Sequence, residues 1–202
     1  MKKIGLIVLM LAALNTFGQD MGIGIRGGDL NGITFKKYSS ANDIEISLGN
    51  ASYFYSNNTL TNNLFNDWIN KNYTYSNFEL LGVRKSSAVA AHFRMLFHKN
   101  LDKIGTENVK GLVWYYGIGA QIRSRKINYD YRYKFNSTDP WSYALGENIR
   151  DIDLGGEGIL GLEYTFAEVP LSLFLDINLF VEIVDNPLAF WFQGGSGIRY
   201  RF

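Results

Sequence analysis

The fold is decided by one stretch near the end of the chain, Leu171-Ser172-Leu173-Phe174-Leu175-Asp176-Ile177-Asn178-Leu179-Phe180-Val181-Glu182. Aliphatic residues occupy every second position, and the positions between them are mostly polar. A helix would scatter the aliphatic side chains around a cylinder, whereas a strand places all of them on one face. The stretch is therefore predicted to be a β-strand with one apolar face.

The same alternation recurs along the chain after residue 20. Besides 171–182, it predicts strands over residues 21–28, 33–38, 43–48, 89–98, 112–123, 152–166 and 197–202. Eight is an even number, as bacterial outer-membrane barrels require, and several of these strands are long enough to cross a bilayer when tilted. The expected fold is all-β: an antiparallel up-and-down transmembrane β-barrel of eight strands.

The first nineteen residues predict export. Lys2 and Lys3 precede an apolar run, Ile4–Leu14, and a small or polar exit follows at Asn15–Gln19. This order is that of a secretory signal peptide, and eleven apolar residues fall short of the ~20 that a spanning helix needs. We expect a signal peptide over 1–19, cleaved near Gly18 or Gln19, and a barrel domain over 20–202.

Composition narrows the class of protein. The chain has no cysteine, so no disulfide stabilises the exported product. Removing Lys2 and Lys3 leaves 18 basic against 19 acidic residues, so no nucleic-acid partner is expected. The 21 glycines, 13 tyrosines and 14 phenylalanines suit closely packed strands and interfacial aromatic girdles.

The long polar segments indicate which end of the barrel faces outward. With both termini periplasmic, the short turns Ser39–Asn42 and Ala167–Pro170 are periplasmic, and the segments 57–85 and 126–150 are extracellular. The segment 99–111 is the exception, because it is long for a connection on the periplasmic side. In 126–150, tyrosines alternate with charged residues, so a strand continues there. The rings of this strand either form a contact surface or cover one another, and both alternatives stay open. A possible unknown extracellular ligand is expected to bind through 57–85 and 126–150.

The polar faces predict what fills the lumen. If the apolar faces contact outer-membrane lipid, five arginines and six carboxylates point inward. An eight-stranded barrel is just wide enough for side chains, so these groups should pair. In particular, we expect Glu157, Glu163 and Asp176 to pair with Arg123, Arg199 or Arg201. A soluble lipocalin-like barrel would reverse the two faces, and alternation alone does not separate the two cases. The expected network comprises Arg26, Glu45, Arg94, Arg123, Asp153, Glu157, Glu163, Asp176, Glu182, Arg199 and Arg201.

Aromatic residues gather near the expected periplasmic strand ends. Amphipathic rings prefer the headgroup level of a membrane, which indicates a girdle there. Ordinary strand propensity for aromatic residues is the alternative explanation. The residues concerned are Phe97, Trp114, Tyr116, Tyr164, Phe166, Tyr200 and Phe202.

The last six residues, Gly197-Ile198-Arg199-Tyr200-Arg201-Phe202, resemble the β-signal that the outer-membrane assembly machinery reads. The resemblance implies that Gly197, Ile198, Tyr200 and Phe202 bind that machinery during biogenesis. The position two before Gly197 is usually polar and is Gly195 here.

Further segments are similar to small porin-like outer-membrane β-barrel proteins common in Bacteroidota. They are 32–36, 114–120, 158–166 and 198–202, although 57–85 looks longer than in that group. The resemblance implies an outer-membrane barrel and supplies no activity.

Candidate chemistry is sparse. His92 and His98 lie six residues apart with Arg94 between them, which disfavours a metal cation. Ser87, His92 and Glu45 offer the residue types of a hydrolase triad, but nothing marks the serine as activated. No catalytic, cofactor or metal residue is therefore predicted.

The expected role of the protein is a structural one or a surface interaction. The alternatives are a narrow transport barrel for small solutes and a lipid-modifying enzyme of the outer membrane.

Overall fold

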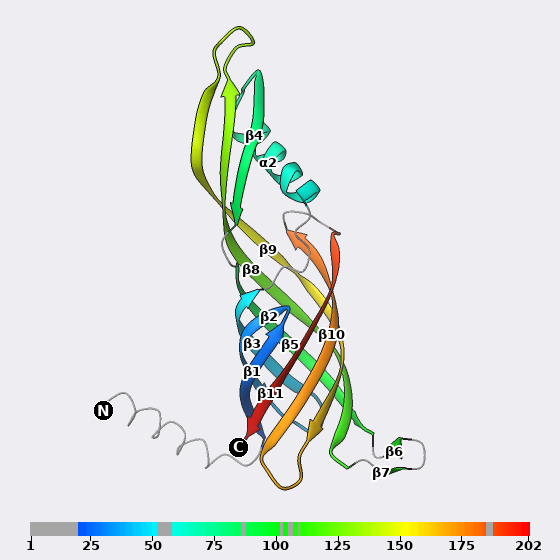
Figure 1. Cartoon of the computed structure of the whole chain (residues 1–202). Coiled ribbons are helices and arrows are strands. Elements are labelled where there is room, and N and C mark those ends of the chain that lie inside the picture. Colours follow the sequence, from blue (N-terminus) through cyan, green and yellow to red (C-terminus); the bar gives the residue numbers. More distant parts are fainter. Residues whose placement is uncertain are drawn as a thin grey trace, which may run out of the picture. The chain divides into compact units, whose positions relative to one another are not determined.

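The computed structural model describes residues 20–51, 58–85, 88–101, 103–104, 107–108, 110–184 and 188–202 (Figure 1). The expected signal peptide and Ser87 lie outside these residues. The elements are β1 (Met21–Gly28), β2 (Leu30–Lys37), β3 (Asp43–Ala51), α2 (Asn58–Asn72), β4 (Asn77–Lys85), β5 (Ala88–Asn100), β6 (Lys103–Ile104), β7 (Glu107–Asn108), β8 (Leu112–Lys134), β9 (Ser142–Thr165), β10 (Leu171–Val184) and β11 (Phe190–Arg201).

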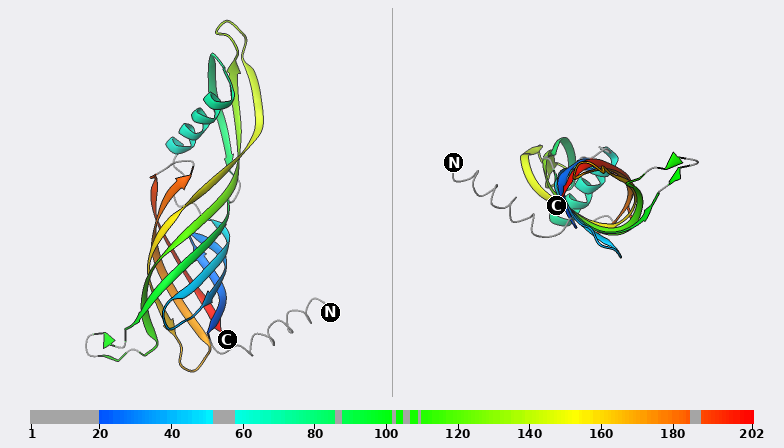
Figure 2. Two further views of the ribbon diagram at one scale, coloured as in Figure 1. Left: turned by 180° about the vertical axis from the view of Figure 1, so that it is seen from behind. Right: turned by 90° about the horizontal axis from the view of Figure 1, so that it is seen from below.

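Eight of these strands close into a barrel. Their order is β8-β5-β3-β2-β1-β11-β10-β9, and β9 pairs again with β8. Seen along its axis, this part of the chain is a closed ring (Figure 2). The pairings β1–β2, β2–β3, β1–β11, β9–β10 and β10–β11 are all antiparallel. The predicted all-β antiparallel barrel of eight strands is confirmed.

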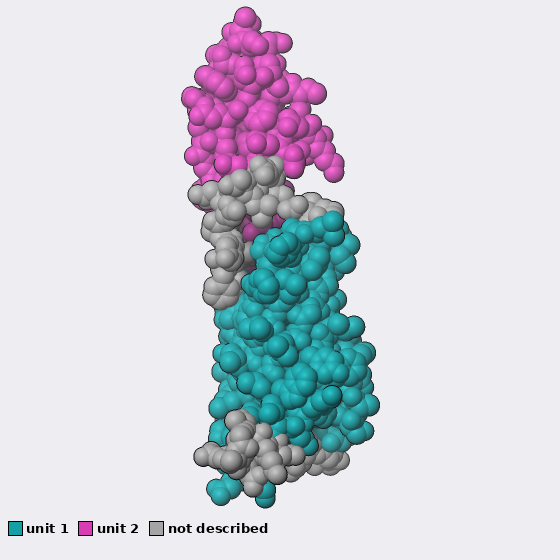
Figure 3. Space-filling model, turned by 90° about the vertical axis from the view of Figure 1, so that its right-hand side faces the viewer, with its two compact units in different colours: residues 1–52, 89–123, 153–202 teal, residues 53–88, 124–152 magenta. Residues whose placement is uncertain are grey.

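The chain forms two compact units, coloured separately in Figure 3. Of the described residues, those within 1–52, 89–123 and 153–202 form the barrel unit, and those within 53–88 and 124–152 form the second unit. The expected barrel range, 20–202, therefore also contains a second unit. Where the sequence indicated long polar loops, this unit holds α2, β4 and the continuations of β8 and β9, with Asn77 of β4 opposite Lys134 of β8.

The barrel's two faces are inverted relative to those of a soluble protein. On β10, Leu173 is 44% exposed and Leu175 and Ile177 are each 58% exposed, whereas Phe174 and Asp176 between them are at most 3% exposed. Aliphatic and aromatic residues of the other barrel strands repeat this outward exposure. They include Ile25, Ile33, Leu48, Val89, Phe93, Ile118, Leu160 and Tyr200. The apolar faces point outward, which excludes the lipocalin-like arrangement.

Glycine makes room for a large ring inside the barrel at one position in particular. A Cβ atom on Gly161 would lie 2.4 Å from the Tyr115 ring. That ring extends from β8 over Gly161 of β9 and donates its hydroxyl hydrogen bond to Asp176 of β10, at 3.1 Å. A neighbouring glycine of β9, Gly158, has nothing within 4 Å of the same position.

The second unit has its own core, in which α2 covers one face of the β4–β8–β9 sheet. Phe65 and Ile69 of the helix are almost fully buried against Ile127, Tyr129 and Tyr131. The Phe65 ring centre lies 5.0 Å from that of Tyr129. Among the described residues, no helix is of the length and apolarity needed to span a bilayer.

Candidate functional site

Arg94 lies at the centre of the lumen with carboxylates from four parts of the chain around it. Its side chain is buried, and its Nε atom donates to Glu157 Oε1 at 2.7 Å. Its other nitrogens lie 3.4 Å from Asp176 Oδ1, 3.5 Å from Glu45 Oε1 and 3.6 Å from Asp29 Oδ2. These residues come from β9, β10, β3 and the β1–β2 turn, so one guanidinium links strands around the whole ring.

Arg26 forms the second arginine of this central layer. It donates to Asp176 through both Nη atoms, at 2.8 and 2.6 Å, and to Asp29 Oδ1 at 3.1 Å. Asp176 therefore lies between Arg26 and Arg94. A bidentate contact of this kind fixes the orientation of both planar groups as well as attracting them.

A second layer lies between the centre and the end that carries the chain termini. Arg199 donates to Glu163 Oε2 at 3.1 Å and also pairs with Glu45. Lys36 donates to the same Glu163 oxygen at 2.8 Å and lies 3.1 Å from Asp43 Oδ2. All five side chains are almost completely buried, so each charge depends on its partners rather than on water.

On the other side of the centre, Glu157 accepts hydrogen bonds from Gln121 and from Asn178. Arg123 donates to Gln121 at 2.5 Å and lies over the Phe180 ring. Glu182 is buried and Asp153 is half-buried on the same strands, β10 and β9.

The partners differ from those expected for two of the three carboxylates. Glu163 lies with Arg199, but Glu157 lies with Arg94, and Asp176 with Arg26 and Arg94. Alternation fixes which face a residue occupies, whereas partners across the lumen depend on the stagger of the strands.

Three charged residues of the network were not among those expected. Lys36 shares its face with Thr34, two positions earlier, so alternation alone would have placed it inside. Asp43 shares its face with Glu45 in the same way. Asp29 lies in the turn between β1 and β2, and its buried position beside Arg26 has no signal in the alternation.

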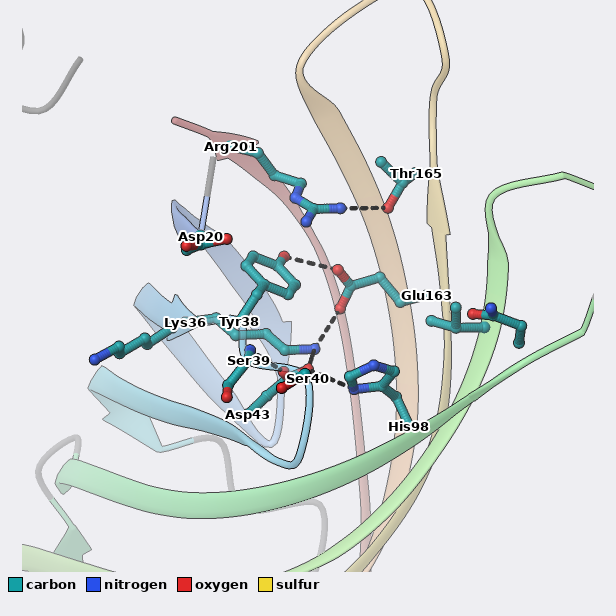
Figure 4. Close-up of a pocket in the computed structure, with 13 residues that line it drawn as sticks. Asp20, Lys36, Tyr38, Ser39, Ser40, Asp43, His98, Glu163, Thr165 and Arg201 are labelled. Atoms are coloured by element: carbon teal, nitrogen blue, oxygen red, sulfur yellow. Dashed lines mark hydrogen bonds and ion pairs between the residues drawn. The ribbon is translucent and has the colours of Figure 1, made fainter. Parts of the chain in front are cut away.

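The barrel end that carries the termini opens into a cavity of about 660 Å³ (Figure 4). Lys36 and Glu163 form its floor, with Tyr38 donating to Glu163 at 2.7 Å. On one side His98 Nδ1 lies 3.4 Å from Asp43 Oδ2. Arg201 projects in from β11, donates to Thr165 at 3.2 Å, and lies 4.1 Å from the centre of the Tyr38 ring.

The histidines face different carboxylates. His92 is buried in the lumen with Nδ1 4.0 Å from Glu157, whereas His98 faces Asp43 at the cavity. Among the residues that the structure describes, no three histidine or acidic side chains are placed to hold a metal ion together. Of the other two residues of the candidate hydrolase triad, Glu45 pairs with Arg199, and Ser87 lies outside the described residues.

The last strand joins the first. Arg201 of β11 lies opposite Gly22 of β1, and Phe202 and Met21 exchange backbone hydrogen bonds of 2.9 and 3.1 Å. Gly197, Ile198 and Tyr200 lie within β11. The Tyr200 and Phe202 rings stack with centres 6.4 Å apart, and Phe202 is only 7% exposed.

Other aromatic rings form pairs near the same barrel end. Phe97 stacks on Tyr116 with ring centres 5.6 Å apart, and Trp114 lies 5.5 Å from Tyr116. Tyr164 meets Phe166 edge to face at 5.0 Å. These are the residue types and neighbours that an interfacial girdle uses.

In the second unit, the tyrosines of β8 partly cover one another. Tyr75 stacks on Tyr133 with ring centres 4.2 Å apart, and the row ends at Phe135, which is 61% exposed. Tyr131 and Tyr73 both donate to Glu147, at 2.6 and 2.7 Å. Burial, followed by this hydrogen bond, raises the pKa of Tyr131; for Tyr73 the hydrogen bond to Glu147 is the main cause of a raised pKa.

No protein-family model and no curated protein matches the chain. Among solved structures it is similar to Ail, the attachment invasion locus protein of Yersinia pestis, at 9% identity and a TM-score of 0.45, covering 90% of this chain and 96% of Ail. It is also similar to Neisserial surface protein A, at 8% identity and a TM-score of 0.43, covering 90% and 93%.

Proposed function

We propose that the chain is an integral outer-membrane β-barrel protein with a structural or surface-interaction role and no catalytic activity. The observation that carries this proposal is the inversion of the barrel's faces. Leu175 and Ile177 are each 58% exposed around a lumen in which Arg94 and Arg199 are fully buried. An outward aliphatic belt of this size is unfavourable in water and favourable in hydrocarbon, while the closed sheet satisfies its own backbone groups.

The charge-paired lumen supports a barrel that does not conduct. Arg94 and Arg26 hold Asp29, Glu45 and Asp176 across its centre, where an open path would have to run. We expect conductance at background level in planar bilayers. Steady channel currents from the purified protein would favour the narrow transport barrel instead.

The second unit is proposed to be extracellular and to make whatever contacts the protein has. It contains the continuations of β8 and β9 that correspond to the long polar segments of the sequence, and its rings Phe135 and Tyr143 are each 61% exposed. Aromatic surfaces of this kind are enriched in protein contacts. Placement in the group of small Bacteroidota barrels, cleavage of a signal peptide and recognition by the assembly machinery stay predictions.

Cell fractionation tests the membrane assignment most directly. The protein should appear in the outer-membrane fraction, and unheated samples should migrate differently from heated ones in gels because the folded barrel resists unfolding by detergent. Recovery in the soluble periplasmic fraction would overturn the proposal.

A further inference from the structure

We propose that the cavity at the barrel end carrying the termini binds a phosphate group, with Arg201 as its main contact. The cavity measures about 660 Å³, within the size range of small-molecule sites. Its floor is built from buried charged side chains, Lys36 and Glu163, each about 1% exposed. The site does not depend on the proposed membrane location, although one of its two ligand sources does.

The acidic groups of the cavity's floor and side are already engaged. Glu163 accepts hydrogen bonds from Lys36, Arg199 and Tyr38. Asp43 lies 3.1 Å from Lys36 and accepts the backbone N–H of Ser39 at 2.9 Å. These carboxylates therefore have their positive partners within the protein and add little net repulsion toward an incoming anion.

Most of the other polar side chains that line the cavity are hydrogen-bond donors. Arg201 lines the cavity without a carboxylate contact among the described residues, and Ser39 and Ser40 line it with Arg201. Asp20 is the one exposed acid in the lining. A guanidinium without an acidic partner and two hydroxyl-bearing residues around one hollow suit an anion with several oxygens, such as a phosphate group.

Arg201 is held in place before any ligand arrives. Its guanidinium lies on the Tyr38 ring, 4.1 Å from the ring centre, and one nitrogen donates to Thr165. Figure 4 shows it reaching into the cavity from the strand opposite Ser39 and Asp43. A planar cation already fixed by stacking loses little freedom on binding, which favours affinity.

The phosphate has two sources, a phospholipid headgroup at the membrane surface or a soluble phosphate compound. Both are tested with the folded full-length barrel in phosphate-free detergent, using glycerol 3-phosphate as one probe and phosphatidylglycerol in mixed micelles as the other, with binding followed by phosphorus NMR. Binding of glycerol 3-phosphate identifies a soluble source, and binding of phosphatidylglycerol alone identifies a lipid source. Binding of neither probe overturns the proposal.

Charge variants test whether phosphate binding depends on this cavity or only on the overall charge of the protein. Arg201→Gln should weaken binding at least about tenfold, because a charged hydrogen-bonding partner is lost. Asp20→Asn should tighten binding severalfold, a change that damage to the fold would not produce. Arg150→Gln makes the same substitution in the second unit and should leave affinity unchanged.

Three results would contradict the proposal: unchanged binding in Arg201→Gln, weaker binding in Asp20→Asn, or an equal loss in Arg150→Gln. Arg201 lies in the last strand, so Arg201→Gln is first checked for folding by gel mobility. If it does not fold, Ser40→Ala, which changes another residue of the lining, replaces it; a severalfold loss supports the site, and unchanged binding overturns it.

Discussion

At the scale of single residues, Arg94 lies at the centre of the charge network in the lumen. Four carboxylates lie within 3.6 Å of its nitrogens, and the side chain has almost no access to water. Removing Arg94 would leave buried carboxylates without this positive partner. A buried carboxylate without a positive partner carries an uncompensated desolvation penalty.

We therefore expect Arg94→Met to destabilise the folded barrel by roughly 3–5 kcal/mol. The free energy of unfolding is measured by urea titration in detergent micelles, with tryptophan fluorescence as the signal. Arg84→Met is the matched control, because Arg84 pairs with Asp130 at 3.0 Å with its side chain 66% exposed. An exposed pair of that kind contributes about 0–1 kcal/mol. Equal losses in the two variants would mean that the lumen network is not stabilising.

Gly161 gives a second prediction at this scale. Gly161→Val would place a Cβ atom 2.4 Å from the Tyr115 ring and displace its hydroxyl from Asp176. Overpacking of this kind costs about 1–3 kcal/mol, and the lost hydrogen bond adds to it. Gly158→Val in the same strand meets no atom within 4 Å and should be tolerated. Similar unfolding midpoints for both variants would contradict the close contact.

Residue positions divide clearly into those that sequence predicts and those it does not. Alternation placed Asp176 and Arg199 in the lumen because a strand repeats every two residues, and both are buried. It did not identify Arg94 as the partner of Glu157, because β5 and β9 are not neighbours in the sheet. Contacts across a lumen depend on strand tilt and stagger, which no single strand's pattern records.

At the scale of elements, the helix α2 lies within 57–85, a segment whose sequence predicts a loop. Phe65, Trp68 and Ile69 have the i, i+3, i+4 spacing of a helix face, and they pack on the sheet. Asparagines crowd the positions between them, so the average character of 57–85 is polar and the segment reads as a loop. A short apolar stripe gains its stability from the sheet it covers, which the segment alone does not reveal.

The shared carboxylate of the second unit predicts a response to alkaline pH. An unfolded tyrosine ionises near pH 10, whereas the pKa values of Tyr131 and Tyr73 are raised in the folded unit. The folded state therefore holds these protons to higher pH than the unfolded state. Their contribution to stability is complete below about pH 10 and is lost as the pH rises further.

Glu147→Gln should lower both tyrosine pKa values, because it removes the negative charge that opposes phenolate formation. The ionisation of Tyr131 is isolated by subtracting the phenolate absorbance of Tyr131→Phe from that of the parent across a pH titration. Glu79→Gln removes the same charge from a carboxylate that contacts Arg132, and it serves as the control. An unshifted Tyr131 titration in Glu147→Gln would show that burial alone raises the pKa.

At the scale of the whole molecule, closure depends on residues almost 180 positions apart. β1 pairs with β11 over seven residue pairs, from Gly22–Arg201 to Gly28–Gly195. Contacts this distant in sequence form late, because the entropy of closing the intervening chain must be overcome first. Before that step, both β1 and β11 present an unpaired edge.

Deleting Phe202 should separate assembly from stability. The residue stacks on Tyr200 at the strand end, and losing one partly interfacial ring costs about 1.5–3 kcal/mol at most. If the terminal phenylalanine is needed for recognition, as its resemblance to a β-signal implies, the deletion should lower outer-membrane levels sharply while the purified variant still refolds in detergent. Membrane levels equal to the parent's would exclude the recognition role, and failure to refold would make Phe202 chiefly structural.

Because Met21 and Phe202 exchange backbone hydrogen bonds, the two ends of the described chain lie side by side. A circular permutant that joins residue 202 to residue 20 through a short linker, and opens the turn after Glu168, would keep every strand neighbour of the barrel. It should refold in detergent, since the same pairs remain available in the same order around the ring. In cells it would present β9 rather than β11 as its last strand. Refolding of this permutant together with poor assembly in cells would show that the strand pairing does not depend on where the chain starts, whereas assembly depends on which strand comes last.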